Sequence, residues 1–138
     1  MRKPFNEEAE RWLTHARDEF ADADELRHRQ RFYMALFHFQ QAAEKALRAY
    51  LLAAVKSVAV LRTHVAVGDL LATAAAADPE FESLRPAKRL DQYYLSTRYP
   101  NGLPGGVPSR FYDDPDEAAE ASRLAAAVLE LVGRKLGV

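Results

Sequence analysis

Arginine and aromatic side chains are concentrated between residues 98 and 112, where their types suit recognition of a negatively charged group. The set consists of Arg98, Tyr99, Arg110, Phe111 and Tyr112. A guanidinium group binds phosphates and carboxylates, and an aromatic neighbour can stack on a base or anchor a protein interface. We therefore expect this segment to contact an anionic ligand or a partner. The alternative is structural: Arg98 caps the C-terminus of a preceding helix, and Tyr99 and Phe111 seal the end of the fold.

A second group of polar side chains recurs at helical spacing between residues 31 and 48. At about 100° per residue, one arc of a helix carries Arg31, His38, Gln41, Lys45 and Arg48. Residues 26–62 hold seven bases against one acid, whereas residues 1–25 hold eight acids against four bases. Mutual neutralisation of two adjacent antiparallel helices is the favoured interpretation, and a local anion-binding surface is the alternative. His38, Lys45 and, further along the chain, His64 are candidate ligand- or partner-binding residues.

Several kinds of site are excluded by residues that the sequence lacks. There is no cysteine, which excludes disulfides, thiolate metal ligands and cysteine nucleophiles. There is no glycine-rich phosphate loop, and no histidine or carboxylate cluster has the spacing of a metal site. Asp113, Asp114 and Asp116 fit the start of a helix better than a cation site. We therefore expect neither a cofactor nor a metal.

Charge and hydropathy restrict the partners and the location. The net charge is −1, whereas a dedicated duplex-binding domain is usually basic. No apolar run has the length of a signal peptide or of a membrane span. We therefore expect a cytoplasmic protein that does not contact the membrane.

The spacing of apolar residues predicts an all-α chain. Helices are expected at about 7–27, 32–54, 65–77, 86–97 and 115–135. A long loop, rich in proline and glycine, is expected over 97–114. Because the other connections are short, we expect residues 1–138 to form one domain, an up-and-down bundle of four to five helices.

The expected helix over 32–54 should lie at the centre of this bundle. Its core face should carry Phe32, Ala35, Leu36, Phe39, Ala42, Ala43, Ala46, Leu47 and Tyr50. Beside this face lie Tyr33, Phe37, Leu51 and Leu52, which would leave apolar surface outside the core. Such an excess favours a second contact, most simply a homodimer.

The same helix carries a recognisable run, Ala35-Leu36-Phe37-His38-Phe39-Gln40-Gln41-Ala42-Ala43-Glu44-Lys45-Ala46-Leu47-Arg48-Ala49. This run resembles the signature helix of HEPN domains. Three further features occur in the same order as in that family, so the resemblance covers nearly the whole chain. They are Thr63-His64 followed by Asp69-Leu70-Leu71, then Arg98-Tyr99-Pro100, and finally the segment 116–119. It implies a four- or five-helix bundle, usually a dimer. Stand-alone prokaryotic members are often paired with a minimal nucleotidyltransferase, sometimes as toxin and antitoxin.

The resemblance also raises the question of catalysis, because many HEPN domains are metal-independent RNases. Their active site is an arginine and a later histidine with four to six residues between them, a pair that suits proton transfer and stabilisation of a charged phosphate. No histidine follows His64, so Arg98 and Arg110 lack this partner. Arg31 and His38 match the spacing, although not in the usual late position.

Two functions therefore remain. The favoured prediction is a non-catalytic, dimeric interaction or nucleotide-responsive module, partnered with a minimal nucleotidyltransferase. The alternative is an RNase toxin with a displaced site at Arg31 and His38, which would bind RNA.

Overall fold

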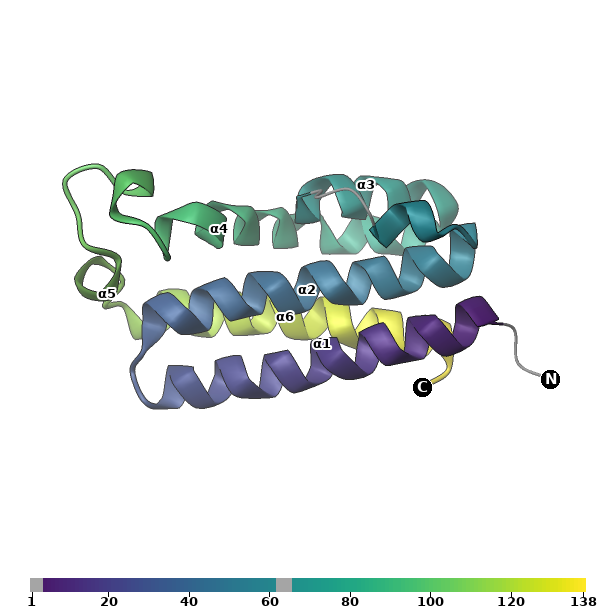
Figure 1. Ribbon diagram of the computed structural model, residues 1–138, viewed down its shortest axis with the longest axis horizontal. Coiled ribbons are helices and arrows are strands. Elements are labelled where there is room, and N and C mark those ends of the chain that lie inside the picture. The colour runs from purple at the N-terminus through teal and green to yellow at the C-terminus, as the bar shows by residue number, and fades with distance from the viewer. Residues whose placement is uncertain (1–3, 62–65) are drawn as a thin grey trace.

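The computed structural model describes residues 4–61 and 66–138, and it places three long helices side by side along one axis (Figure 1). Helices α1 (Pro4–His28) and α2 (Phe32–Val55) form an antiparallel pair, and α6 (Pro115–Leu136) packs against both. The described residues include helices and no strand, which confirms the all-α bundle. His64, predicted as a ligand- or partner-binding residue, lies outside the described residues, and so does Thr63.

Shorter helices form a second row along α2. They are η1 (Val58–Leu61), α3 (Val67–Ala77), η2 (Pro79–Gln92) and α4 (Tyr93–Ser96). The helix expected over 86–97 corresponds to two elements, the 3-10 helix η2, which begins earlier at Pro79, and the short α4 that follows it. Pro86 lies inside η2 and has no N–H to donate, which disfavours α-helical pairing there.

Asp91 of η2 fixes the start of α3. Its two carboxylate oxygens accept hydrogen bonds from the backbone N–H groups of Val67 and Gly68, at 2.8 and 2.9 Å. These donors belong to the first turn of α3 and have no partner within the helix. A Cβ atom at Gly68 would lie 3.2 Å from Cβ of Lys88, so a glycine allows the two helices to approach this closely.

The segment 97–114, predicted as a continuous loop, contains two short helices. These are η3 (Pro100–Gly102) and α5 (Pro108–Phe111). Each begins at a proline, whose fixed φ and missing N–H suit the first helical position. Two of the three prolines that indicated a loop, Pro100 and Pro108, are therefore the residues that start its short helices.

The core is centred on α2, as its apolar spacing predicted. All nine residues of the predicted core face are buried. Leu51 and Leu52 are also buried, against the prediction that they leave apolar surface exposed. The row of shorter helices covers this side of α2, and only Tyr33 and Phe37 of that group stay partly exposed. Within the described residues, no helix has the length and apolar character needed to cross a membrane.

Candidate functional site

α4 leads toward the end of the bundle opposite the N-terminus (Figure 1). Arg98, two residues beyond α4, is held among three aromatic rings. Its Cζ atom lies 4.6 Å from the ring centroid of Phe37, 4.5 Å from that of Tyr94 and 5.0 Å from that of Tyr99. Its Nε–H donates a hydrogen bond to the backbone carbonyl of Tyr94, at 2.7 Å. The guanidinium group is thus fixed at the surface, and no described residue accepts a hydrogen bond from its terminal nitrogens.

Four large apolar side chains in the segment that includes Arg98 are exposed to solvent. Leu95 is 54% exposed, Tyr99 49%, Val107 50% and Phe111 56%. Leu95 and Tyr99, together with Asn101 and Gly102, line a shallow pocket of about 280 Å³. We call the exposed face formed by residues 94–111 the α4–α5 surface. Exposed apolar residues that gather in this way mark interaction sites, whereas single ones need no explanation.

Tyr112 was predicted to bind a ligand or partner together with Arg98 and Tyr99, but it is buried and does not belong to this surface. Its ring is buried and packs edge-on against Tyr93, with centroids 5.9 Å apart. Its hydroxyl lies 2.6 Å from Oγ of Ser96. Tyr93 in turn donates to Glu117 at 2.8 Å, and burial together with this carboxylate raises its pKa. Tyr112 therefore seals the end of the bundle, while Phe111, assigned to the seal in the alternative interpretation, is exposed.

Glu19 of α1 binds both His38 and Lys45 of α2. His38 Nδ1 lies 2.7 Å from Glu19 Oε2, and Lys45 Nζ lies 2.5 Å from Glu19 Oε1. Lys45 also contacts His15 Nε2, at 3.3 Å. Burial acts to raise the pKa of Glu19, but the hydrogen bonds from His38 and Lys45 outweigh it and hold the pKa below its usual range. The charges of the two antiparallel helices, predicted to neutralise each other, thus meet at Glu19.

The sequence did not single out Glu19. The acidic composition of residues 1–25 indicated an acidic partner for the basic arc, but eight acids were available. Only the register of α1 against α2 decides which of them meets His38 and Lys45.

The arc that was predicted to be basic is divided among three environments. Arg31 is exposed at the start of α2, with its Cζ atom 5.8 Å from the ring centroid of Tyr33. His38 and Lys45 turn toward α1. Arg48 is buried and donates to the carbonyl of Val60. Among the described residues of the single chain, no contact joins Arg31 to His38.

Arg110 lies on α5 and is exposed, within the α4–α5 surface. The structure therefore brings Arg98, Tyr99 and Arg110 to one end of the molecule, in agreement with their proximity in the sequence. The first turn of α2, which Arg31 directly precedes, lies at this same end of the bundle (Figure 1).

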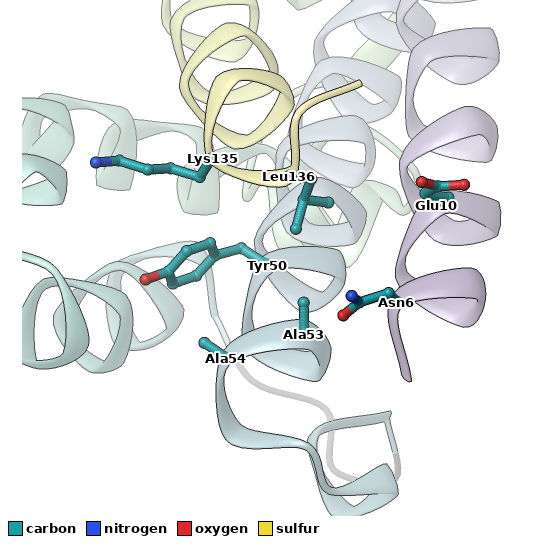
Figure 2. Close-up of a pocket in the computed structure, with 7 residues that line it drawn as sticks. All are labelled: Asn6, Glu10, Tyr50, Ala53, Ala54, Lys135 and Leu136. Carbon is teal, nitrogen blue, oxygen red and sulfur yellow. The ribbon is translucent and has the colours of Figure 1, made fainter. Parts of the chain in front are cut away.

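A separate pocket of about 310 Å³ lies at the other end, where α1 begins and α2 and α6 end (Figure 2). It is lined by Asn6, Glu10, Tyr50, Ala53, Ala54, Lys135 and Leu136. The charge of Lys135 is taken up by Asp78 and Glu80, each at 2.7 Å. In the part of the chain that the structure describes, no group of three histidine or carboxylate side chains is arranged to hold a metal ion.

Comparison with known proteins identifies the family. The HEPN domain family matches residues 9–135. TT1696 from Thermus thermophilus is 36% identical, with a TM-score of 0.77 over 92% of this chain and 97% of that one. ST0689, an archaeal HEPN homologue, has the same fold, with 23% identity and a TM-score of 0.71 over 93% of this chain and 97% of its own. No curated protein shows a significant match. The chain belongs to the HEPN domain family.

Proposed function

We propose that this chain is a non-catalytic, dimeric interaction module of the cytoplasm. It pairs with a minimal nucleotidyltransferase, in an arrangement of the toxin–antitoxin type. The observation that carries the proposal is the α4–α5 surface, where a fixed arginine lies among exposed aromatic and aliphatic side chains.

The composition of this surface favours a protein over a small ligand. Arginine and tyrosine are among the residues enriched at the energetic centres of protein interfaces. Arg98 is held by three rings and by the Tyr94 carbonyl, so little side-chain entropy would be lost when a partner binds it. The pocket beside Leu95 and Tyr99 is shallow, and it suits an inserted side chain better than an enclosed metabolite.

The contacts of His38 support a structural role for that residue. Glu19 binds its Nδ1 atom, and the same carboxylate binds Lys45, so the three residues tie α1 to α2. Arg31, its partner in the alternative RNase site, turns toward Tyr33 instead. We therefore favour the interaction module over the RNase.

The proposal is tested by co-elution with a purified minimal nucleotidyltransferase, ideally the one encoded beside this chain. We expect a complex that contains two copies of the chain, measured by light scattering. A matched pair of double variants tests the surface: Tyr99→Ser with Phe111→Ser, and Val55→Ser with Val138→Ser, which removes apolar side chains of similar exposure elsewhere. The first pair should dissociate the assembly and the second should leave it intact. Equal behaviour of the two pairs would refute the role of the α4–α5 surface.

A further inference from the structure

Tyr50, near the end of α2, carries a hydroxyl group that has no hydrogen-bond partner among the described residues. Only 8% of the residue is exposed, and its ring packs against that of Phe81, with centroids 4.4 Å apart. A polar group without a partner on so buried a side chain needs an explanation, because such groups are usually satisfied. Tyr50 lines the pocket of about 310 Å³ shown in Figure 2, where a bound molecule would supply the missing partner.

The side of this pocket formed by Tyr50 and Lys135 offers hydrogen-bond donors. The two side chains extend in the same direction (Figure 2). The ammonium group of Lys135 binds Asp78 and Glu80, at 2.7 Å each, which leaves one of its three N–H groups. Burial, and after it the charge of Asp78, raise the pKa of Tyr50 against the effect of Lys135, so the hydroxyl keeps its proton at neutral pH. Two donors side by side suit an acceptor oxygen.

The charges around these donors cancel one another. Arg134 also binds Glu80, at 3.2 Å, so the two bases Arg134 and Lys135 are balanced by the two acids Asp78 and Glu80. A ligand carboxylate would therefore find no excess positive charge here. An uncharged acceptor, such as a hydroxyl oxygen, fits this side of the pocket better.

The opposite side of the pocket, formed by α1, has the chemistry for a cation. It carries Asn6 and Glu10, whose amide and carboxylate oxygens accept hydrogen bonds (Figure 2). Ala53 and Ala54 belong to the last turn of α2, where the carbonyl groups have no donor within the helix and the helix dipole favours positive charge. Because α6 also ends at this pocket, with Leu136, two carboxyl ends of helices meet there against the one amino end of α1.

We propose that this pocket binds a small organic cation with an ammonium group at one end and an uncharged acceptor oxygen at the other, as in an amino alcohol. Glu10 and Asn6 bind the ammonium group. The oxygen accepts hydrogen bonds from Tyr50 and Lys135, and the methylene groups between the two ends pack on the alanine and leucine side chains of the wall. A volume of about 310 Å³ lies at the lower end of the range for ligand pockets, which restricts the ligand to a few heavy atoms.

This site is independent of the proposed function. It lies where α1 begins and α2 ends, whereas the α4–α5 surface lies toward the other end of the bundle (Figure 1). Failure of either proposal would therefore leave the other standing.

A titration of the isotope-labelled chain with amino alcohols of three to six carbon atoms, followed by two-dimensional NMR, tests the site. At least one member should shift the amide signals of Ala53 and Ala54 to saturation, with a dissociation constant on the order of 1 mM, as expected for so small a ligand. The alkylamine of the same length should bind less tightly, and the alcohol without the amine should bind least. Signals that do not move throughout the series would overturn the proposal, and so would an alcohol that binds as tightly as the amino alcohol.

Two variants assign the ends of the ligand. Tyr50→Phe keeps the buried ring and removes the hydroxyl, so it should weaken the amino alcohol about fivefold to tenfold and leave the alkylamine unchanged. Glu10→Gln removes the charge and should weaken both ligands about tenfold or more. The matched controls Tyr99→Phe and Glu25→Gln make the same changes at exposed residues outside the pocket and should bind as the wild type does.

The variants have outcomes that contradict the proposal. Equal binding of the amino alcohol by the wild type and Tyr50→Phe would overturn the role of the hydroxyl and with it the site, as would binding that is unchanged in Glu10→Gln. Thermal unfolding checks that each variant is folded. The comparison of the three ligands on the wild-type chain depends on no variant, so it decides the question even where a variant does not fold.

Discussion

The carboxylate of Glu19 should be worth far more to stability than a surface acid of the same type. Its side chain is 11% exposed, and it accepts hydrogen bonds from two donors of the neighbouring helix, His38 and Lys45. Hydrogen bonds to charged groups contribute roughly 1.5–3 kcal/mol each. Glu19→Gln keeps one acceptor oxygen but leaves the ammonium of Lys45 without its counter-charge. We therefore expect the free energy of unfolding to fall by about 2–4 kcal/mol.

Urea denaturation at neutral pH measures this loss, and Glu25→Gln is the matched control. Glu25 pairs with Arg29, which lies just beyond the end of the same helix, but both side chains are largely exposed, so its removal should cost less than about 0.5 kcal/mol. Equal losses in the two variants would refute the account of Glu19 as the tie between α1 and α2.

The pH dependence provides a second readout of the same residue. Hydrogen bonds hold the folded-state pKa of Glu19 below its usual range, so the stabilisation is present above the usual carboxyl pKa. It is lost as the pH falls through the lowered pKa, because the unfolded chain then binds the proton first. The wild type should therefore lose its advantage over Glu19→Gln between about pH 5 and pH 3. An advantage that persists at low pH would contradict the assignment.

Three further predictions concern the core, the start of α3 and catalysis. Phe39→Ala should cost about 3–5 kcal/mol of unfolding free energy, because its ring is fully buried and lies 5.4 Å from that of Phe20; a loss under about 1 kcal/mol in urea titration would contradict its place in the core. Asp91→Ala should cost about 1–2 kcal/mol, since two N–H groups of α3 lose their acceptor, and an unchanged urea midpoint would argue against that cap. Purified protein should cleave RNA no faster than His38→Ala in a gel assay; cleavage that disappears in both His38→Ala and Arg31→Ala would favour the RNase.

The sequence was most informative where a periodic pattern is long. The apolar residues of α2 repeat over six turns without glycine or proline, so their spacing alone places Phe39 and Leu47 in the core. The burial of Leu51 and Leu52 could not be predicted from this spacing. They lie outside the main stripe, and whether they are covered depends on the packing of the shorter helices against the C-terminal part of α2.

Short elements were harder to predict, for a local reason. Pro86 interrupts the pattern from which a helix is recognised, and a 3-10 helix as long as η2, 14 residues, is uncommon, so the local sequence did not predict it. The path of η2 depends instead on tertiary contacts, above all on Asp91 binding the first turn of α3.

The candidate surface was found in part because its chemistry is local. Arg98, Tyr99 and Arg110 are close in sequence, and the structure keeps them at one end of the bundle. Phe37 completes the ring cluster around Arg98 from a distant part of the chain, which composition could not indicate. Tyr112 and Phe111 are neighbours with opposite exposure, and only the turn at the end of α5 decides which of the two is buried.

The mass of the protein in solution tests the central claim most directly. Sedimentation equilibrium of the wild-type chain at micromolar concentration should give about twice the 15.5 kDa of one chain. A dimer is the state that the proposed function predicts. A single species with the mass of one chain across the concentration range would contradict the account.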